Sequence, residues 1–153
     1  MIDVKDKRYI ILEIIPTAIK DGDIVQLSAL KINGLNLEDR FDYRLNYKFI
    51  DNKDLVDMIS YDSDSFNYVD TTKEIVNKFK KWIGNYKLLI IDNSYTENYL
   101  VGIKNKRESI FNYLDMEYSD DIIERVIEKY GLVFSNHIVD LLYEALIYES
   151  NNK

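Results

Sequence analysis

Residues 9–15 read YIILEII, an apolar run that is interrupted only by Glu13 and ended by Pro16. β-Branched residues are favoured in strands, and a proline cannot donate a hydrogen bond to a neighbouring strand. A short run that is apolar at nearly every position predicts a strand buried in the middle of a sheet. Glu13 is then a carboxylate inside an apolar strand, so it needs a partner or the edge of a cleft, because an unpaired buried charge is costly.

The two segments that follow predict a three-stranded antiparallel meander. Residues 24–32, IVQLSALKI, alternate enough to form a half-buried strand. Asn33 and Gly34 are a strong signal for a hairpin turn, since both residues tolerate positive φ. Residues 40–47, RFDYRLNY, alternate polar and apolar side chains with a period of two, which is typical of a strand with one buried face.

A helix and a second buried strand are expected next. Thr71 and Glu74 form a capping-box pattern at the start of a helix that Gly84 ends. Residues 87–91, KLLII, predict another buried strand, and a further helix is expected to begin near Ser94.

The remaining segments complete an α/β arrangement. We expect residues 50–70 to be irregular and residues 110–114 to form a short edge strand. Ser119 is the expected cap of a helix that Gly131 ends, and residues 138–148 predict a last helix. The order of elements predicts a mixed central sheet, the antiparallel meander plus parallel strands, flanked by helices.

Composition and charge restrict the classes of protein to which the chain can belong. Its 153 residues, 46% hydrophobic and 31% charged, suit one compact domain, which we place at residues 1–153. Without cysteine there are no disulfides or thiolate zinc sites, and no apolar run approaches the roughly 20 residues that span a bilayer. We therefore expect a cytoplasmic protein without membrane contact. The net charge of −7 argues against a general binder of duplex nucleic acid, which needs a basic face.

Several segments, taken in order, resemble the proofreading 3′–5′ exonucleases of the DnaQ-like, epsilon-subunit type. The matching segments are YIILEII (9–15), DIVQLSALKINGLNLEDRF (23–41), MISYDSDSFNYV (58–69), KLLIIDNSYTENYL (87–100) and IIERVIEKYGLVFSNHIVDLLYEALIY (122–148). The resemblance covers nearly the whole chain and rests on the order and spacing of these segments. It implies a ribonuclease H-like fold.

The resemblance also implies a reaction and a set of site residues. In that family, two Mg²⁺ or Mn²⁺ ions held by acidic side chains activate the attacking water, and a histidine acts as general base. Carried over to this chain, the resemblance makes Glu13 and His137 the candidate catalytic residues. It makes Glu13, Glu97 and Asp140 the candidate metal ligands.

The chain departs from the family at the other ligand positions. Ile15, Thr96 and Leu142 stand where the resemblance leads us to expect carboxylates, which implies an impaired site. Tyr61 and Tyr95 are candidates for stacking on the bases of a bound strand. Because the chain has 13 tyrosines, ordinary packing is the better default explanation of these two.

Each candidate residue also has a structural interpretation. A buried ion pair or backbone contact would explain Glu13 as well as a metal ion does. A single histidine at the start of a helix is more often a capping or packing residue than a catalyst. Glu97 and Asp140 would both suit the solvated face of a helix.

Three functions therefore remain open. The first is an exonuclease-like domain that is catalytically impaired, needs no cofactor, and acts by binding a single-stranded nucleic-acid end or a protein partner. The second is an active 3′–5′ exonuclease that uses Mg²⁺ or Mn²⁺ with a rearranged set of carboxylates. The third is a non-enzymatic inhibitory or structural protein of a mobile element, whose acidic surface mimics nucleic acid.

Overall fold

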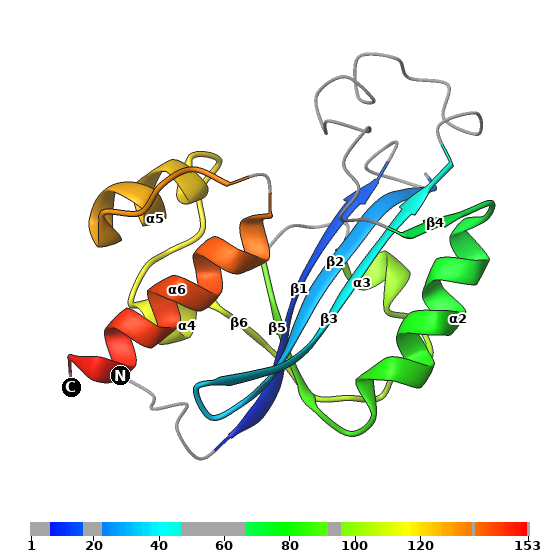
Figure 1. The fold of residues 1–153 in the computed structure, drawn as a ribbon, viewed down its shortest axis with the longest axis horizontal. Coiled ribbons are helices and arrows are strands. Elements are labelled where there is room, and N and C mark those ends of the chain that lie inside the picture. Colours follow the sequence, from blue (N-terminus) through cyan, green and yellow to red (C-terminus); the bar gives the residue numbers. More distant parts are fainter. Residues whose placement is uncertain (1–6, 17–22, 47–66, 92–95, 136, 153) are drawn as a thin grey trace.

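A mixed β-sheet runs through the centre of the molecule (Figure 1). The computed structural model describes residues 7–16, 23–46, 67–91, 96–135 and 137–152. The strands in these segments are β1 Arg8–Pro16, β2 Ile24–Asn33, β3 Asn36–Leu45, β4 Asn67–Val69, β5 Lys87–Ile90 and β6 Arg107–Ser109. They lie in the order β4-β3-β2-β1-β5-β6.

The predicted antiparallel meander is confirmed. β1 pairs antiparallel with β2, and β2 with β3, while β5 joins β1 in parallel, β6 joins β5 in parallel and β4 joins β3 in parallel. β1 is an interior strand, as its apolar run predicts. In the turn between β2 and β3, Gly34 has a φ of 66°, which a glycine adopts without strain, and its carbonyl accepts a hydrogen bond from the Tyr9 hydroxyl at 3.0 Å.

Five described helices cover the two faces of this sheet (Figure 1). They are α2 Thr72–Ile83, α3 Thr96–Tyr99, α4 Phe111–Leu114, α5 Ile122–Tyr130 and α6 Ile138–Asn151. Apolar residues of α2 pack with Ile10, Leu12 and Ile14 of β1, whereas those of α4, α5 and α6 pack with Tyr9 and Ile11. Alternate residues of β1 thus contribute to two hydrophobic cores, one on each face of the sheet. In the described parts of the chain, no helix has the length and apolar character to cross a membrane.

β2 is more deeply buried than its alternation predicts. Every residue of β2 is buried except Lys31, which is half-buried, and Asn33 at the end of the strand. The expectation of a half-buried strand was wrong because helices lie on both sides of this part of the sheet. The polar residues of β2 are therefore inside the molecule instead of in water.

The structure confirms three of the predicted helix ends and corrects the start of α5. The Thr71 hydroxyl accepts a hydrogen bond from the Glu74 backbone N–H at 3.1 Å, and Gly84 ends α2. Gly131 ends α5 with a φ of 63°. Ser119 is not the cap of α5: the helix begins after Asp121, and the Ser119 hydroxyl donates to the Asp121 carboxylate at 2.7 Å.

Two short elements differ from the expectation. Residues 111–114 form the helical turn α4, with Ile110 as its N-cap residue, in place of an edge strand, and the edge strand β6 lies just before them. The apolar residues of this segment are buried beneath α6, which a helical turn achieves as well as a strand does. β4 lies in a segment that was expected to be irregular, and its three residues are too few to show a period. Ser94 lies outside the described residues, and α3 begins at Thr96.

Candidate functional site

A row of polar side chains crosses the sheet on the face that α6 covers. Glu13 of β1 pairs in register with Ser28 of β2, and Ser28 pairs with Asp42 of β3. Residues two positions apart in a strand share a face, and Ile11 belongs to the core beneath α6. The row therefore lies on the face of the sheet that α6 covers, toward the C-terminal end of β1.

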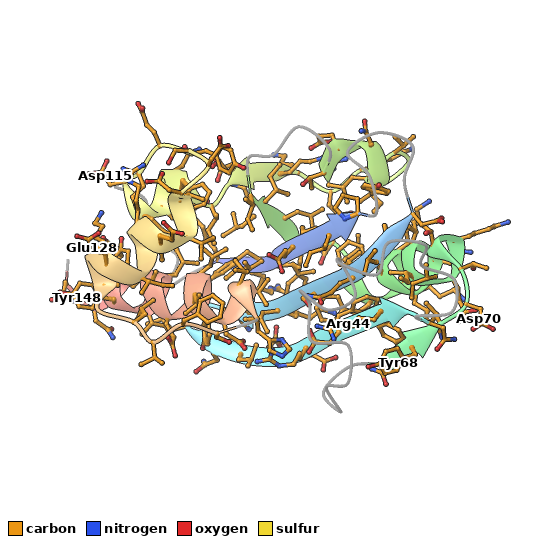
Figure 2. All side chains as sticks on the ribbon, turned by 90° about the horizontal axis from the view of Figure 1, so that it is seen from above. Arg44, Tyr68, Asp70, Asp115, Glu128 and Tyr148 are labelled. Carbon is orange, nitrogen blue, oxygen red and sulfur yellow. The ribbon has the colours of Figure 1, made fainter. Side chains whose placement is uncertain are left out.

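A second polar row lies next to the first. Gln26 pairs in register with Arg44, and the Arg44 Nε donates a hydrogen bond to the Gln26 Oε1 at 2.8 Å. The Gln26 amide donates in turn to the Ser28 hydroxyl at 3.1 Å, which links the two rows. Arg44 is only 1% exposed, and Figure 2 shows it inside the molecule on β3. A guanidinium this deeply buried needs nearby negative charge.

Glu13 lies close enough to Arg44 for their charges to interact. Burial raises the pKa of Glu13 to about 8, and the positive charge of Arg44 opposes the rise. Its Oε1 is closed off from solvent and accepts no hydrogen bond from any described residue. At neutral pH burial therefore favours the neutral, protonated form of the carboxyl.

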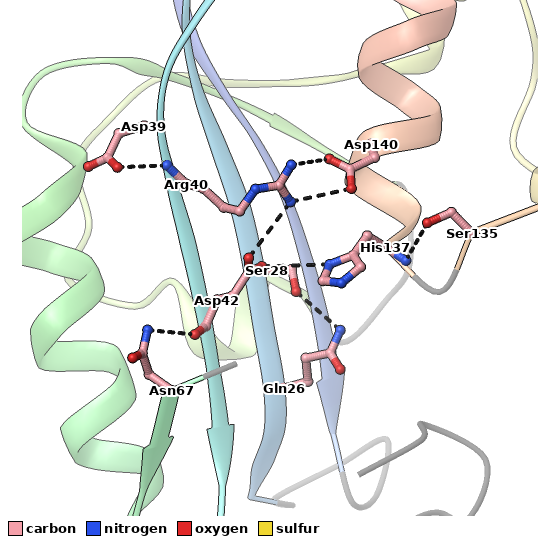
Figure 3. A network of polar contacts seen from close by, with 9 residues as sticks. All are labelled: Gln26, Ser28, Asp39, Arg40, Asp42, Asn67, Ser135, His137 and Asp140. Atoms are coloured by element: carbon pink, nitrogen blue, oxygen red, sulfur yellow. Dashed lines mark hydrogen bonds and ion pairs between the residues drawn. The ribbon is translucent and has the colours of Figure 1, made fainter. Parts of the chain in front are cut away.

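Asp42 and His137 form the other end of the first row (Figure 3). The Nδ1 of His137 lies 4.0 Å from the Oδ1 of Asp42, and the Nη1 of Arg40 lies 3.7 Å from the Oδ2. Burial raises the pKa of Asp42, while Arg40 and His137 oppose the rise. His137 is the N-cap residue of α6, but its side chain makes no capping hydrogen bond. The helix start thus places the imidazole beside the Asp42 carboxylate.

Asp42 was not among the candidate residues. It is a polar member of the alternating segment at residues 40–47, and alternation assigns such residues to a solvated face. In the folded chain α6 and its N-cap lie over that face, so Asp42 is only 4% exposed. The one available signal was that Asp42 and Arg44 share a strand face with Arg40, a charge-rich set for one side of a strand.

Asp140 is bound by an arginine. The Arg40 Nη2 lies 2.6 Å from the Asp140 Oδ1, and the Nη1 lies 3.3 Å from the Oδ2, which is a bidentate pair (Figure 3). The side chains are 38% and 31% exposed, so the pair lies at the rim of the site. The same guanidinium also lies beside Asp42, so Arg40 forms ion pairs with two carboxylates.

Glu97 is also bound by an arginine, on a different element. Its carboxylate lies 2.9 Å from the Arg107 Nε, and its side chain is 55% exposed. Within the described residues it bonds to Arg107 and to none of the other candidate residues. The candidates Tyr61 and Tyr95 lie outside the described residues.

The candidate carboxylates do not fit a two-metal centre. Asp140 and Glu97 are each paired with an arginine, and Glu13 is buried near a third. These guanidinium groups supply the positive charge that divalent ions would otherwise provide. Across the segments that the structure describes, no three His, Cys, Asp or Glu side chains are grouped so that they could hold a metal ion. Leu142, at an expected ligand position, is fully buried in the apolar core.

Comparison with known proteins identifies no family. No protein-family model matches the chain, and no curated protein is significantly similar to it. The geometry of the site is therefore the main basis for a functional proposal.

Proposed function

We propose that the chain is an exonuclease-like domain that has lost metal-dependent catalysis and acts by binding a nucleic-acid end or a protein. The resemblance described above suggests the ancestry. The sheet is compatible with a ribonuclease H-like fold, because an antiparallel meander is followed by a strand that joins β1 in parallel on its other side. Fold alone does not carry function, so the proposal depends on the site.

The arginine partners of the candidate ligands carry the proposal. Arg40 binds Asp140, Arg107 binds Glu97, and Arg44 lies near Glu13. A two-metal nuclease needs free, ionised carboxylates that converge on both ions. In this chain two carboxylates are neutralised from within the protein, and the third is held protonated by burial.

Binding is the activity that such a scaffold retains. Hydrolysis requires ligand geometry that is correct to a fraction of an ångström, whereas binding requires only a complementary surface. The net charge of −7 makes a protein partner or a short single-stranded end a better match than a long duplex.

A nuclease assay tests the proposal. Single-stranded DNA and RNA oligonucleotides labelled at the 5′ end are incubated with the purified chain and millimolar Mg²⁺ or Mn²⁺. We expect no shortening beyond that in a chelator control, and calorimetric titration with Mn²⁺ should show no binding of two ions.

Metal-dependent release of nucleotides from the 3′ end would overturn the proposal if it depended on the site. Glu13→Gln and His137→Ala should then each abolish the release, while the exposed variant Glu128→Gln retains it. Activity that survives both site variants would point to a contaminating nuclease.

A further inference from the structure

An open groove lies between β3 and α6, at the rim of the polar network. It has a volume of about 530 Å³ and joins residues of β3, of α6 and of the connection between α5 and α6. Leu37, Val133 and Ile147 form part of its apolar lining, and Arg40, Asp140 and Glu144 form part of its polar lining. The Arg40–Asp140 ion pair is thus shared between the site and the groove.

Val133 lines the groove, and the next residue in the chain is Phe134; both are among the most exposed apolar side chains in the described structure. Val133 is 85% exposed and its neighbour Phe134 is 67% exposed, while Leu37 across the groove is 42% exposed. The preceding residue, Leu132, packs against the core, so the connection turns its next two side chains outward. Adjacent exposed apolar side chains beside a groove are typical of a protein-interaction site, since water is a poor environment for them.

Charge decides what can occupy the groove. Asp140 is neutralised by Arg40, whereas Glu144 is exposed and makes no ion pair with any described residue. The groove therefore has a net negative charge, as has the whole chain at −7. Phosphate groups and a second copy of the chain would both be repelled, while a positively charged protein segment would be attracted.

We propose that this groove binds a segment of another protein in which a large apolar side chain lies next to a lysine or arginine. The apolar side chain packs against Val133, Phe134 and Leu37, and the basic group pairs with Glu144. This inference rests on the proposed function, because it names the partner of a domain that acts by binding. Apolar contact supplies most of the affinity, and the charge pair supplies orientation.

A selection from a phage-displayed library of random peptides tests the inference. Peptides enriched on the wild-type chain are synthesised, and their affinities are measured by fluorescence anisotropy. We expect the enriched peptides to carry Phe, Leu or Trp beside Lys or Arg. The double variant Val133→Ser/Phe134→Ser should weaken their binding by about tenfold or more. Glu144→Gln should weaken it by about threefold.

Matched variants control for changes that are not specific to the groove. Val101 is 75% exposed, and Val101→Ser removes a similar apolar side chain next to Leu100, which packs in the core on the α2 side of the sheet. Glu128→Gln removes an exposed charge from α5. Both controls should bind the peptides as the wild type does. Unchanged thermal unfolding of every variant shows that the fold is retained.

Several results would overturn the inference. They are the absence of enriched peptides, peptides without basic residues, and peptides that bind the double variant as well as the wild type. A dimer detected by sedimentation, or oligonucleotide binding, that the double variant abolishes would assign the groove to a different occupant. Failure of the proposed function is distinguished by the nuclease assay: if nucleotides are released, that proposal fails whatever the peptides do.

Discussion

Arg40 binds Asp140 in a bidentate ion pair that joins the middle of β3 to the first turn of α6, 100 residues later in the chain. A carboxylate in the first turn of a helix also interacts favourably with the helix dipole. Together these contacts hold the start of α6 over the polar rows of the sheet. The pair positions His137 beside Asp42 and forms one wall of the groove.

Removing Arg40 should lower the free energy of unfolding more than removing Asp140 does. Asp140→Asn should lower the free energy of unfolding by about 0.5–1 kcal/mol, since the pair is partly exposed. Arg40→Gln should cost more, because it also removes a positive charge 3.7 Å from the buried Asp42. Urea denaturation at neutral pH measures both values. Equal losses would show that Arg40 does not stabilise Asp42.

Glu13→Gln should change the pH dependence of stability. The pKa of Glu13 is about 8 in the folded chain against an ordinary 4.5, so between these values the folded form holds a proton that the unfolded form loses. Wild-type stability therefore falls as the pH rises through this window, and this contribution is absent in the variant. Relative to the wild type, the free energy of unfolding of the variant should rise by about 5 kcal/mol between about pH 4 and about pH 9.

Chemical denaturation of the two proteins over that pH range provides the measurement. Other titrating groups are common to both proteins, so their effects cancel in the difference. A difference that stays constant with pH would mean that Glu13 titrates normally. In that case the carboxyl would be ionised at neutral pH and available to a cation.

Arg44→Met should be strongly destabilising. The Gln26 Oε1 would lose its donor at 2.8 Å, and Glu13 would lose the charge that opposes its raised pKa. Loss of one member of a buried polar network typically costs about 2–4 kcal/mol. The exposed Arg125 provides the control, since Arg125→Met should cost less than about 1 kcal/mol. Similar losses in the two variants, measured by urea unfolding, would contradict the buried network.

Thr71→Ala and Ser119→Ala distinguish a true helix cap from a residue that only resembles one. Thr71 caps α2 through the Glu74 N–H, so its loss should cost about 1 kcal/mol. Ser119 contacts Asp121 and Arg125 on the surface and caps no helix, so its loss should cost a few tenths of a kcal/mol. Thermal unfolding compares the two variants, with Thr71→Ser as the conservative control. If Ser119→Ala costs as much as Thr71→Ala, the start of α5 has been misplaced.

The elements that could be predicted depend on local patterns. The apolar run of β1 and the cap of α2 each lie within a dozen residues, and they specify a strand and a helix wherever the rest of the chain goes. β4 and α4 could not be predicted in the same way. Each has only three or four residues, too few to show a period, and its conformation follows from the neighbours that it contacts.

The same distinction between local patterns and long-range contacts applies to the candidate site. From its place in an apolar strand, Glu13 could be predicted to need a partner, and His137 could be placed at the start of the last helix. The sequence could not show that Asp42 lies in the same row as Glu13. It also could not show that Arg40, Arg44 and Arg107 lie beside the carboxylates expected to bind metal ions.

Local sequence patterns specify the polarity of each segment and the conformation of the longer ones, because these depend on residues close together in the chain. Which charges meet depends on the strand register and on where α6 packs, so it follows from long-range contacts that no local pattern shows. A shift of β3 by one residue would turn Asp42, Arg40 and Arg44 to the opposite face. The polar network is therefore a consequence of long-range packing, and so is the groove proposed to bind a partner.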